Sequence, residues 1–139
     1  MSLIHKTAII GSNVVIGENV TIGPYSVIDG NIKIADNNII KSSVYITGNT
    51  DIGSSNVFHP FCSIGSPPQD LKFRNEITKL IIGSNNTFRE YANVNVGTEG
   101  GGRLTEIRND SLFMVGAHIA HDCFVGNNII MANQATIAG

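Results

Sequence analysis

The stretch Ile10-Gly-Ser-Asn-Val-Val-Ile16-Gly-Glu-Asn-Val-Thr-Ile22-Gly-Pro-Tyr-Ser-Val-Ile28 has an isoleucine at every sixth position. A helix would repeat its apolar residues about every 3.6 positions, and an ordinary amphipathic strand would alternate without interruption. The period of six extends along most of the chain, and every residue on it is hydrophobic, although only 42% of all residues are. The residues on this period are Ile4, Ile10, Ile16, Ile22, Ile28, Ile34, Ile40, Ile46, Ile52, Phe58, Ile64, Ile82, Phe88, Val94, Ile107, Phe113, Ile119, Val125, Met131 and Ile137.

Each six-residue unit predicts a short strand with two inward side chains, followed by a corner. The residue four positions after the periodic one is usually small or β-branched, as in Ala8, Val14, Val20 and Cys62. The corners favour Gly, Asn or Asp, which adopt turn conformations at low cost. Three such strands make one triangular coil, and parallel coils stack about 4.8 Å apart. The prediction is an all-β fold, a left-handed parallel β-helix built from hexapeptide repeats, since the six-residue version of this fold is the left-handed one.

Two segments interrupt the repeat. Residues from about 66 to 81 contain Pro67 and Pro68, which do not fit an inner strand. Residues from about 97 to 104 contain a run of three glycines, and the register slips there by one position. Because the repeat returns after each interruption, both are predicted to be loop excursions from one coil within a single domain of residues 1–139. Loops on a rigid scaffold often carry function.

Composition excludes several classes of protein. The net charge is -2, which excludes a generally basic nucleic-acid binder. No apolar run approaches the roughly 18 residues of a membrane span, and no signal-like segment precedes the repeat. A cytoplasmic location is therefore expected. Cys62 and Cys123 fit no metal or redox spacing and are predicted to be buried structural thiols in a reducing compartment.

The candidate chemical groups lie in Ala117-His118-Ile119-Ala-His121-Asp122-Cys123. Since Ile119 points inward, His118 before it and His121 with Asp122 at the following corner must leave the core. A histidine suits general-base work near neutral pH, and an adjacent carboxylate can fix its tautomer. They could also be ordinary surface residues. A metal site is the third interpretation, but it lacks a third nearby ligand, so neither a metal nor another cofactor is predicted.

A family resemblance distinguishes among these interpretations. Ser63-Ile-Gly-Ser-Pro-Pro-Gln69-Asp70-Leu-Lys72-Phe, Ile82-Gly-Ser-Asn-Asn-Thr-Phe-Arg89-Glu90, Gly97-Thr98 with its glycine run, and Ala117 to Cys123 occur in that order. Together with Ala132-Asn133 and Ala138-Gly139, they resemble the UDP-N-acetylglucosamine O-acyltransferase family over essentially all 139 residues. The resemblance implies an enzyme that transfers a (3-hydroxy)acyl chain from acyl carrier protein to the 3-position of UDP-N-acetylglucosamine. This is the first step of lipid A biosynthesis.

The resemblance also implies a role for each matching catalytic residue. His121 matches the general base, which takes the proton of the sugar 3-hydroxyl as that oxygen attacks the acyl thioester. Asp122 would orient His121. Gly139 matches the glycine whose backbone N–H forms the oxyanion hole.

Substrate contacts and assembly follow from the same resemblance. His118 matches a substrate-binding histidine, while Gln69, Asp70 and Lys72 match a loop that contacts the nucleotide sugar from a neighbouring subunit. The family is a homotrimer, so the expected partners are acyl carrier protein, the nucleotide sugar and two further copies. The basic side chains form either a solvated face or a positive patch for these anionic substrates: Lys72, Arg74, Lys79, Arg89, Arg103 and Arg108.

Four questions stay open at this point. The chain could be another hexapeptide-repeat acyl- or acetyltransferase acting on a nucleotide sugar. It could also be a catalytically incomplete β-helix fragment, because it stops at Ile137-Ala-Gly139 in mid-repeat and lacks the later coils and C-terminal helical domain of the family. Whether a hydroxyl or an amino group accepts the acyl chain, and how long that chain is, are not given by these residues.

Overall fold

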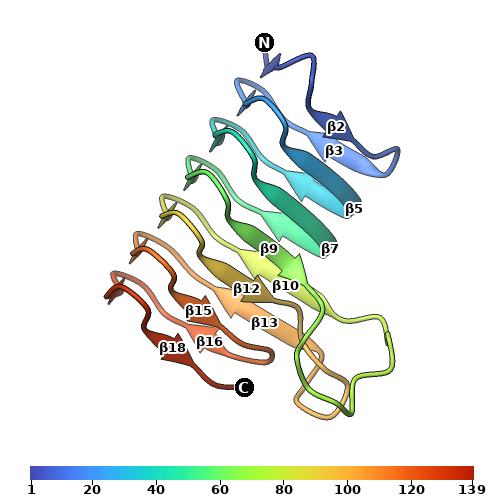
Figure 1. The fold of residues 1–139 in the computed structure, drawn as a ribbon, viewed down its shortest axis with the longest axis vertical. Coiled ribbons are helices and arrows are strands. Elements are labelled where there is room, and N and C mark those ends of the chain that lie inside the picture. Colours follow the sequence, from blue (N-terminus) through green and yellow to red (C-terminus); the bar gives the residue numbers. More distant parts are fainter.

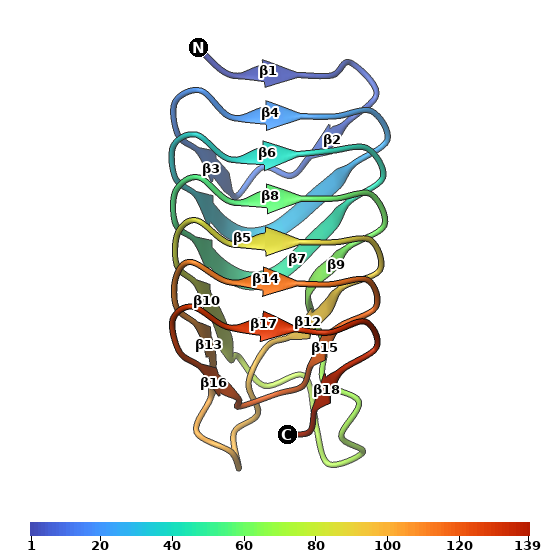
Figure 2. The ribbon, with the colours of Figure 1, turned by 90° about the vertical axis from the view of Figure 1, so that its left-hand side faces the viewer.

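The computed structural model describes residues 1–139 as a triangular prism of parallel strands without helices (Figures 1 and 2). The first face is a seven-stranded sheet: β1 (Leu3–Ile4), β4 (Thr21–Ile22), β6 (Ile39–Ile40), β8 (Val57–Phe58), β11 (Thr87–Phe88), β14 (Leu112–Phe113) and β17 (Ile130–Met131). An eleven-stranded sheet folds over the other two faces. No helix long and apolar enough to cross a membrane is present.

The two remaining faces share the long strands β5 (Val27–Ile34) and β7 (Tyr45–Ile52), which bend around the corner between them. The second face contains β2 (Ile9–Ile10), β9 (Ser63–Ser66), β12 (Asn93–Asn95), β15 (His118–Ile119) and β18 (Thr136–Ile137). The third contains β3 (Val14–Ile16), β10 (Lys79–Ile82), β13 (Leu104–Ile107) and β16 (Phe124–Val125). In Figure 2 the chain runs from left to right across the first face and returns behind it while descending, which is a left-handed turn. The predicted fold is confirmed.

The period-six side chains form the core. Every member from Ile22 to Met131 is buried, whereas Ile4, Ile10, Ile16 and Ile137 on the end coils are partly or fully exposed. The register explains this: Ile22 pairs with Ile4 above it and with Ile40 below it, so equivalent residues stack along the axis. Each coil thus covers the apolar residues of its neighbours, as expected for a solenoid.

Three phenylalanines replace isoleucine in the middle of the first face and stack on one another. The ring centroids of Phe58 and Phe88 are 5.0 Å apart, and those of Phe88 and Phe113 are 4.8 Å apart. All three side chains are essentially inaccessible to solvent. Such offset aromatic pairs add to the free energy gained from burial itself.

A ladder of buried polar residues runs along the corner between the third and first faces. Asn38, Asn56 and Asn86 take the inward position where small or β-branched residues were predicted, and Ser111 follows them. The side-chain oxygen of each asparagine accepts the backbone N–H of the next member, at 2.9, 2.9 and 3.1 Å. Their amide groups donate to corner carbonyls, so these buried polar groups are satisfied and fix the stacking of successive coils.

The corners differ from the prediction in two ways. Left-handed backbone at the corners includes Asn, Asp and Ser, but also Tyr25, Phe61 and Tyr91, with φ of 61, 70 and 63. Several glycines that follow an inward residue, such as Gly53 and Gly83, are needed for close approach rather than for a positive φ, whereas Gly65 has a left-handed φ of 85. A Cβ on Gly53 would lie 2.5 Å from the carbonyl oxygen of Gly83 on the next coil.

Both loops leave the same corner, between the second and third faces, on consecutive coils. Residues 67–78 connect β9 to β10, and residues 96–103 connect β12 to β13. The strand pairing of the first face continues past both loops, because Phe58 pairs with Phe88 and Phe88 pairs with Phe113. Figure 1 shows the two loops side by side beyond the lower right of the prism.

Candidate active site

His121 and Asp122 occupy the next coil at this same corner, directly after β15. Stacking therefore brings together two loops and a histidine that are far apart in sequence. Asp122 has a left-handed φ of 64, which turns its carboxylate back toward the imidazole. His121 Nδ1 lies 2.8 Å from Asp122 Oδ2. An ionised carboxylate only accepts, so Nδ1 carries the proton and Nε2 keeps a free lone pair.

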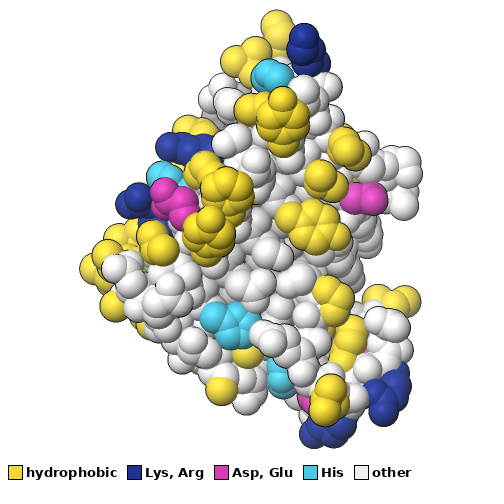
Figure 3. Space-filling view, in the orientation of Figure 1, with side chains coloured by type: hydrophobic (Ala, Val, Ile, Leu, Met, Phe, Trp, Pro, Cys, Tyr) yellow, Lys and Arg dark blue, Asp and Glu magenta, His cyan; other side chains and the backbone are white.

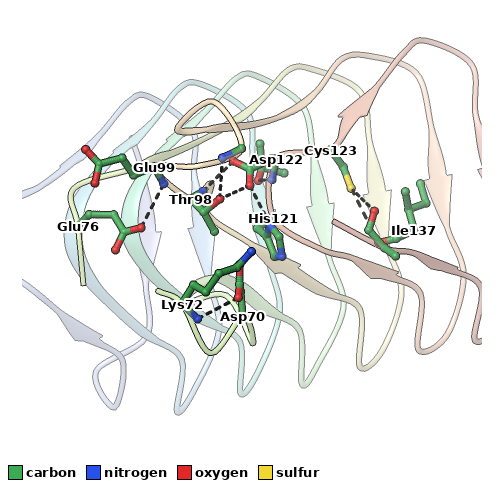
Figure 4. A network of polar contacts seen from close by, with 12 residues as sticks. Asp70, Lys72, Glu76, Thr98, Glu99, His121, Asp122, Cys123 and Ile137 are labelled. Carbon is green, nitrogen blue, oxygen red and sulfur yellow. Dashed lines mark hydrogen bonds and ion pairs between the residues drawn. The ribbon is translucent and has the colours of Figure 1, made fainter. Parts of the chain in front are cut away.

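The 96–103 loop holds the Asp122 carboxylate from the other side (Figure 4). The Thr98 backbone N–H donates to Oδ1 at 2.7 Å, and the Thr98 hydroxyl donates to Oδ2. Thr105 Oγ1 accepts the backbone N–H of Asp122 at 2.9 Å. Partial burial alone would raise the pKa of Asp122, but the hydrogen bonds from Thr98 and His121 outweigh it and hold that pKa below its usual value. Asp122 is therefore an anion at neutral pH.

The prediction that these side chains leave the core is right, but their exposure is smaller than expected. The His121 side chain is 21% exposed and that of Asp122 only 8%. The 96–103 loop explains the lower exposure, because it covers the Asp122 carboxylate. The alternation of inward and outward residues along a strand does not predict such a cover. No role is predicted for Thr98 or Thr105 from the sequence, since neither a threonine in a glycine-rich loop nor one in a short strand carries a distinctive signal.

The glycine run is explained by the packing of this loop on Asp122. A Cβ at Gly97 would lie 2.8 Å from Asp122 Oδ1, and one at Gly101 would overlap the same carboxylate. By contrast, Gly100 and Gly102 have open space around them, but Gly102 has a left-handed φ of 116, which favours glycine. Gly97 and Gly101 are thus required for the loop to reach the carboxylate, and Gly102 is required for its backbone conformation.

The 67–78 loop closes the other side of the site. The Lys72 backbone N–H donates to Asp70 Oδ1 at 2.9 Å, which forms a tight turn that presents both side chains. Glu76 joins the two loops, because its Oε2 accepts the backbone N–H of Glu99 at 3.1 Å. In Figure 4, Asp70 and Lys72 lie opposite His121.

Between these elements runs a groove with two connected parts. The first part has a volume of about 660 Å³ and is lined by Asp70, Lys72, Thr98, His121, Asp122 and Gly139, among others. The second has about 440 Å³ and is lined by Gln69, Asp70, Asn95, His118, His121 and Gly139, among others. Every site residue named from the sequence lines one part or both. Asp70 and Lys72 line the same groove as His121 within one chain, and their contact with the nucleotide sugar of a neighbouring subunit stays a prediction.

Gly139 lies against the imidazole of His121, one coil below it. A Cβ there would overlap the ring, so only glycine fits beside this histidine. Cys123 points the other way, into the core, where its thiol donates to the carbonyl of Ala138 at 3.3 Å. Burial raises the pKa of Cys123, so this thiol stays protonated near the site.

Most of the basic side chains are paired within the chain. Lys79 contacts Asp51 at 2.8 Å, Arg108 contacts Glu106 at 2.7 Å, and Arg89 and Arg103 pair with neighbouring glutamates. The Arg74 guanidinium donates to the carbonyl of Leu71. Neither Lys72 nor Arg74 makes an ion pair, and of these two only Lys72 lines the groove, where the carboxylates of Asp70, Glu76, Glu99 and Asp122 also lie. No group of three His, Cys, Asp or Glu side chains is placed to hold a metal ion.

Replacing Asp122 by asparagine is expected to lower the free energy of unfolding at pH 7 by about 1–3 kcal/mol, since hydrogen bonds to a charged group are the stronger ones. The pKa of Asp122 is lower in the folded chain than in the unfolded one. This contribution is therefore present above the unfolded value of about 3.9 and is lost as the pH falls through the folded value.

Denaturant unfolding from pH 7 down to below pH 4 measures this effect. The difference between wild type and Asp122→Asn should shrink as the pH falls. Asp110→Asn is a matched control, because Asp110 has a similar left-handed φ of 62 but is exposed and makes no side-chain hydrogen bond. A difference that stays constant with pH would contradict the assigned ionisation.

Known proteins share the sequence pattern and the fold of this chain. A model of the bacterial transferase hexapeptide family (six repeats) matches residues 1–30. The acyl-[acyl-carrier-protein]–UDP-N-acetylglucosamine O-acyltransferase of Aliarcobacter butzleri is 57% identical over 139 residues, which is 100% of this chain and 54% of that protein. The protein of the same name from Rickettsia canadensis is 51% identical over 122 residues, covering 88% of this chain and 46% of that protein.

Solved structures give the same result. LpxA from Acinetobacter baumannii superposes with a TM-score of 0.97 at 44% identity, covering 99% of this chain and 53% of that one. LpxA from Bacteroides fragilis, a UDP-N-acetylglucosamine acyltransferase, has a TM-score of 0.96 at 41% identity, with the same coverage of both chains. This chain is homologous to the UDP-N-acetylglucosamine O-acyltransferases. It spans about half the length of the curated relatives it matches.

Proposed function

We propose that this chain carries the acyl-transfer site of a UDP-N-acetylglucosamine O-acyltransferase. The reaction moves a (3-hydroxy)acyl chain from acyl carrier protein to the 3-position of UDP-N-acetylglucosamine, the first step of lipid A biosynthesis. The observation that carries the proposal is the His121–Asp122 pair. His121 Nδ1 lies 2.8 Å from the ionised carboxylate of Asp122, and the imidazole ring of His121 borders the groove between the two loops.

In this mechanism His121 Nε2 removes the proton of the sugar 3-hydroxyl as its oxygen attacks the thioester carbonyl. A C–O bond forms, and the carbonyl oxygen takes a negative charge in the tetrahedral intermediate. When the intermediate collapses, the C–S bond breaks and the imidazolium returns the proton to the carrier thiolate. General acid–base catalysis of this kind contributes about 10²–10⁴-fold in rate.

Asp122 has two tasks in this proposal. It keeps the proton of neutral His121 on Nδ1, and its negative charge stabilises the imidazolium that forms on proton transfer. The lowered pKa of Asp122 supports this role, because the carboxylate stays ionised throughout. Thr98 is a positioning residue, since its two hydrogen bonds fix the carboxylate.

Gly139 and the first loop supply the remaining roles. The Gly139 backbone N–H is assigned to the oxyanion, and one such donor typically contributes about 3 kcal/mol. Its contact with the His121 ring supports this assignment. Lys72, which lines the groove and makes no ion pair within the chain, is assigned to an anionic substrate group. Gln69, Asp70 and His118 are assigned to contacts with the nucleotide sugar.

A transfer assay tests the proposal directly. The protein at its native length is incubated with UDP-N-acetylglucosamine and hydroxyacyl carrier protein, and the acylated sugar is followed by mass spectrometry. The expected result is an O-acylated nucleotide sugar with release of one carrier thiol per product. A second reaction with the 3-amino analogue of the sugar decides which acceptor is preferred. If neither acceptor is acylated, the proposed function is wrong.

We further propose that the chain assembles as a homotrimer through the corner between the first and second faces. Tyr25, Phe61 and Tyr91 are 70%, 53% and 63% exposed there, and the rings of Phe61 and Tyr91 stack at 5.3 Å. Figure 3 shows apolar side chains gathered on this face with charged groups beside them. Large aromatic groups held in left-handed backbone at the surface favour cover by another copy.

Phe61→Asp with Tyr91→Asp is expected to convert the assembly to monomers, because two buried charges would face each interface. Sedimentation equilibrium gives the mass. Phe124→Asp is the control, since Phe124 is also exposed, at 64%, but lies on the third face. A wild-type mass of one chain, or a double variant that keeps the wild-type mass, would exclude assembly through this corner.

A further inference from the structure

Glu76 is the one residue through which the two loops are hydrogen-bonded to each other. Its Oε2 accepts the backbone N–H of Glu99 at 3.1 Å, and no other hydrogen bond or ion pair joins residues 67–78 to residues 96–103. The mechanism gives Glu76 no task, although Glu76 lines the groove together with His121 and Asp122.

Both carboxylate oxygens of Glu76 accept backbone N–H groups. Oε1 accepts that of Arg74 at 2.6 Å, within the same loop, while Oε2 accepts that of Glu99. These hydrogen bonds, that from Arg74 foremost, hold the pKa of Glu76 below its usual value, so Glu76 is an anion at neutral pH. A carboxylate offers an acceptor to each of the two donors. A glutamine amide has one oxygen only and would place its own N–H groups against the second donor.

The segment Thr98–Glu99 lies between two carboxylates. The backbone N–H of Thr98 donates to Asp122 Oδ1 at 2.7 Å, and the next N–H along the chain, that of Glu99, donates to Glu76. Figure 4 shows Thr98 between Glu76 and Asp122. The Thr98 carbonyl and the Glu99 N–H belong to one planar peptide unit, so a shift of Glu99 also shifts Thr98. Glu76 therefore influences how Asp122 is held.

The 67–78 loop is not packed against the prism behind it. A cavity of about 250 Å³ is lined by Phe73 and Glu76 of the loop and by Asn49 of β7, among others. A segment with few packed contacts depends on individual hydrogen bonds for its position. The bond from Glu76 to Glu99 therefore also fixes where the Asp70–Lys72 turn stands beside the groove.

We propose that Glu76 is a positioning residue of the acyl-transfer reaction. With one hydrogen bond it holds the Thr98–Glu99 segment on Asp122 and the Asp70–Lys72 turn beside the groove. The inference rests on the proposed function and assigns Glu76 no contact with a substrate. Loss of Glu76 should therefore lower kcat, because Asp122 orients His121 less well. It should also raise the KM for UDP-N-acetylglucosamine, because the turn is displaced.

Initial rates of Glu76→Gln, in the protein at its native length, test this inference. The kcat should fall about tenfold, which is less than the roughly 100-fold that a misplacement of 1 Å can cost. Glu106→Gln is the matched control, because the Glu106 carboxylate also holds a partner, Arg108 Nε at 2.7 Å, but lies on the third face outside the groove. Its kcat and KM should equal those of wild type. If Glu76→Gln also keeps both constants, the inference is overturned and the proposed function stands.

A double variant distinguishes positioning of Asp122 from a general loss of loop structure. In the Asp122→Asn background, Glu76→Gln should lower kcat less than about twofold, since the carboxylate that it positions is gone. A fall by the same factor in both backgrounds would mean that Glu76 acts independently of Asp122. The unfolding midpoint of Glu76→Gln should equal that of wild type, because Glu76 lies outside the stacked coils. A lower midpoint would assign Glu76 to stability instead.

Nitrogen-15 NMR of the histidine side chains measures the same coupling without a substrate. Glu76→Gln should shift the Nδ1 signal of His121, which reports the 2.8 Å hydrogen bond to Asp122, and should leave that of His5 unchanged. The spectrum of His121→Ala assigns the signal. An unshifted His121 signal would overturn the inference whether or not the chain transfers acyl groups. If the signal shifts but wild type transfers no acyl chain, the proposed function is wrong, and the positioning of His121 by Glu76 is still supported.

Discussion

Replacing His121 by alanine is expected to lower kcat for acyl transfer by about 10²–10⁴-fold, the range that a positioned general base contributes. The KM for UDP-N-acetylglucosamine should change far less, because the proton is transferred only in the transition state. The reason is geometric. His121 Nδ1 is held by Asp122 at 2.8 Å, so Nε2 is the single ring atom free to act on a substrate in the groove.

Initial rates with hydroxyacyl carrier protein, at several concentrations of the nucleotide sugar, separate kcat from KM. His5→Ala is the control, since His5 is an exposed histidine on the first coil whose Nδ1 contacts only the nearby Thr7. Its rate should equal that of wild type. Turnover by His121→Ala within a few-fold of wild type would exclude His121 as the base.

Replacing Phe88 by alanine is expected to lower the free energy of unfolding by about 3–5 kcal/mol, the usual loss for a fully buried phenylalanine. Phe88 is the middle ring of the stack on the first face, in contact with Phe58 above and Phe113 below. Its removal leaves a cavity between two coils and breaks both aromatic pairs. Because coils stabilise each other only through their neighbours, the cavity also uncouples the two halves of the prism.

Chemical denaturation monitored by circular dichroism measures this loss. Phe124→Ala is the control for the same chemical change at a surface site, where Phe124 is 64% exposed and the Arg108 guanidinium lies 5.1 Å from its ring. Phe88→Leu keeps most of the volume and should fall between the two. Equal midpoints for Phe88→Ala and Phe124→Ala would show that the aromatic column does not hold the coils together.

Period-six phasing predicts the architecture because each coil has the same length in most of the chain. A residue that repeats every sixth position meets its equivalent on the next coil, as Ile22 meets Ile4 and Ile40. The phasing also separates inward Ile119 from outward His118 and His121. It does not predict the asparagine ladder, because Asn38, Asn56 and Asn86 become acceptable in the core only once their amides find carbonyls on neighbouring coils.

The candidate active site likewise combines features that the sequence predicts with features that only the tertiary structure decides. The sequence determined the left-handed prism, the outward direction of the two histidines and, by resemblance, the residues to consider. The tertiary structure decided that Thr98 covers Asp122 across 24 residues and that both loops meet His121 at one corner. The physical reason is that a regular repeat fixes positions through its period alone. A loop takes its shape from hydrogen bonds between residues whose separation follows no period, and those bonds exist only when the coils are stacked.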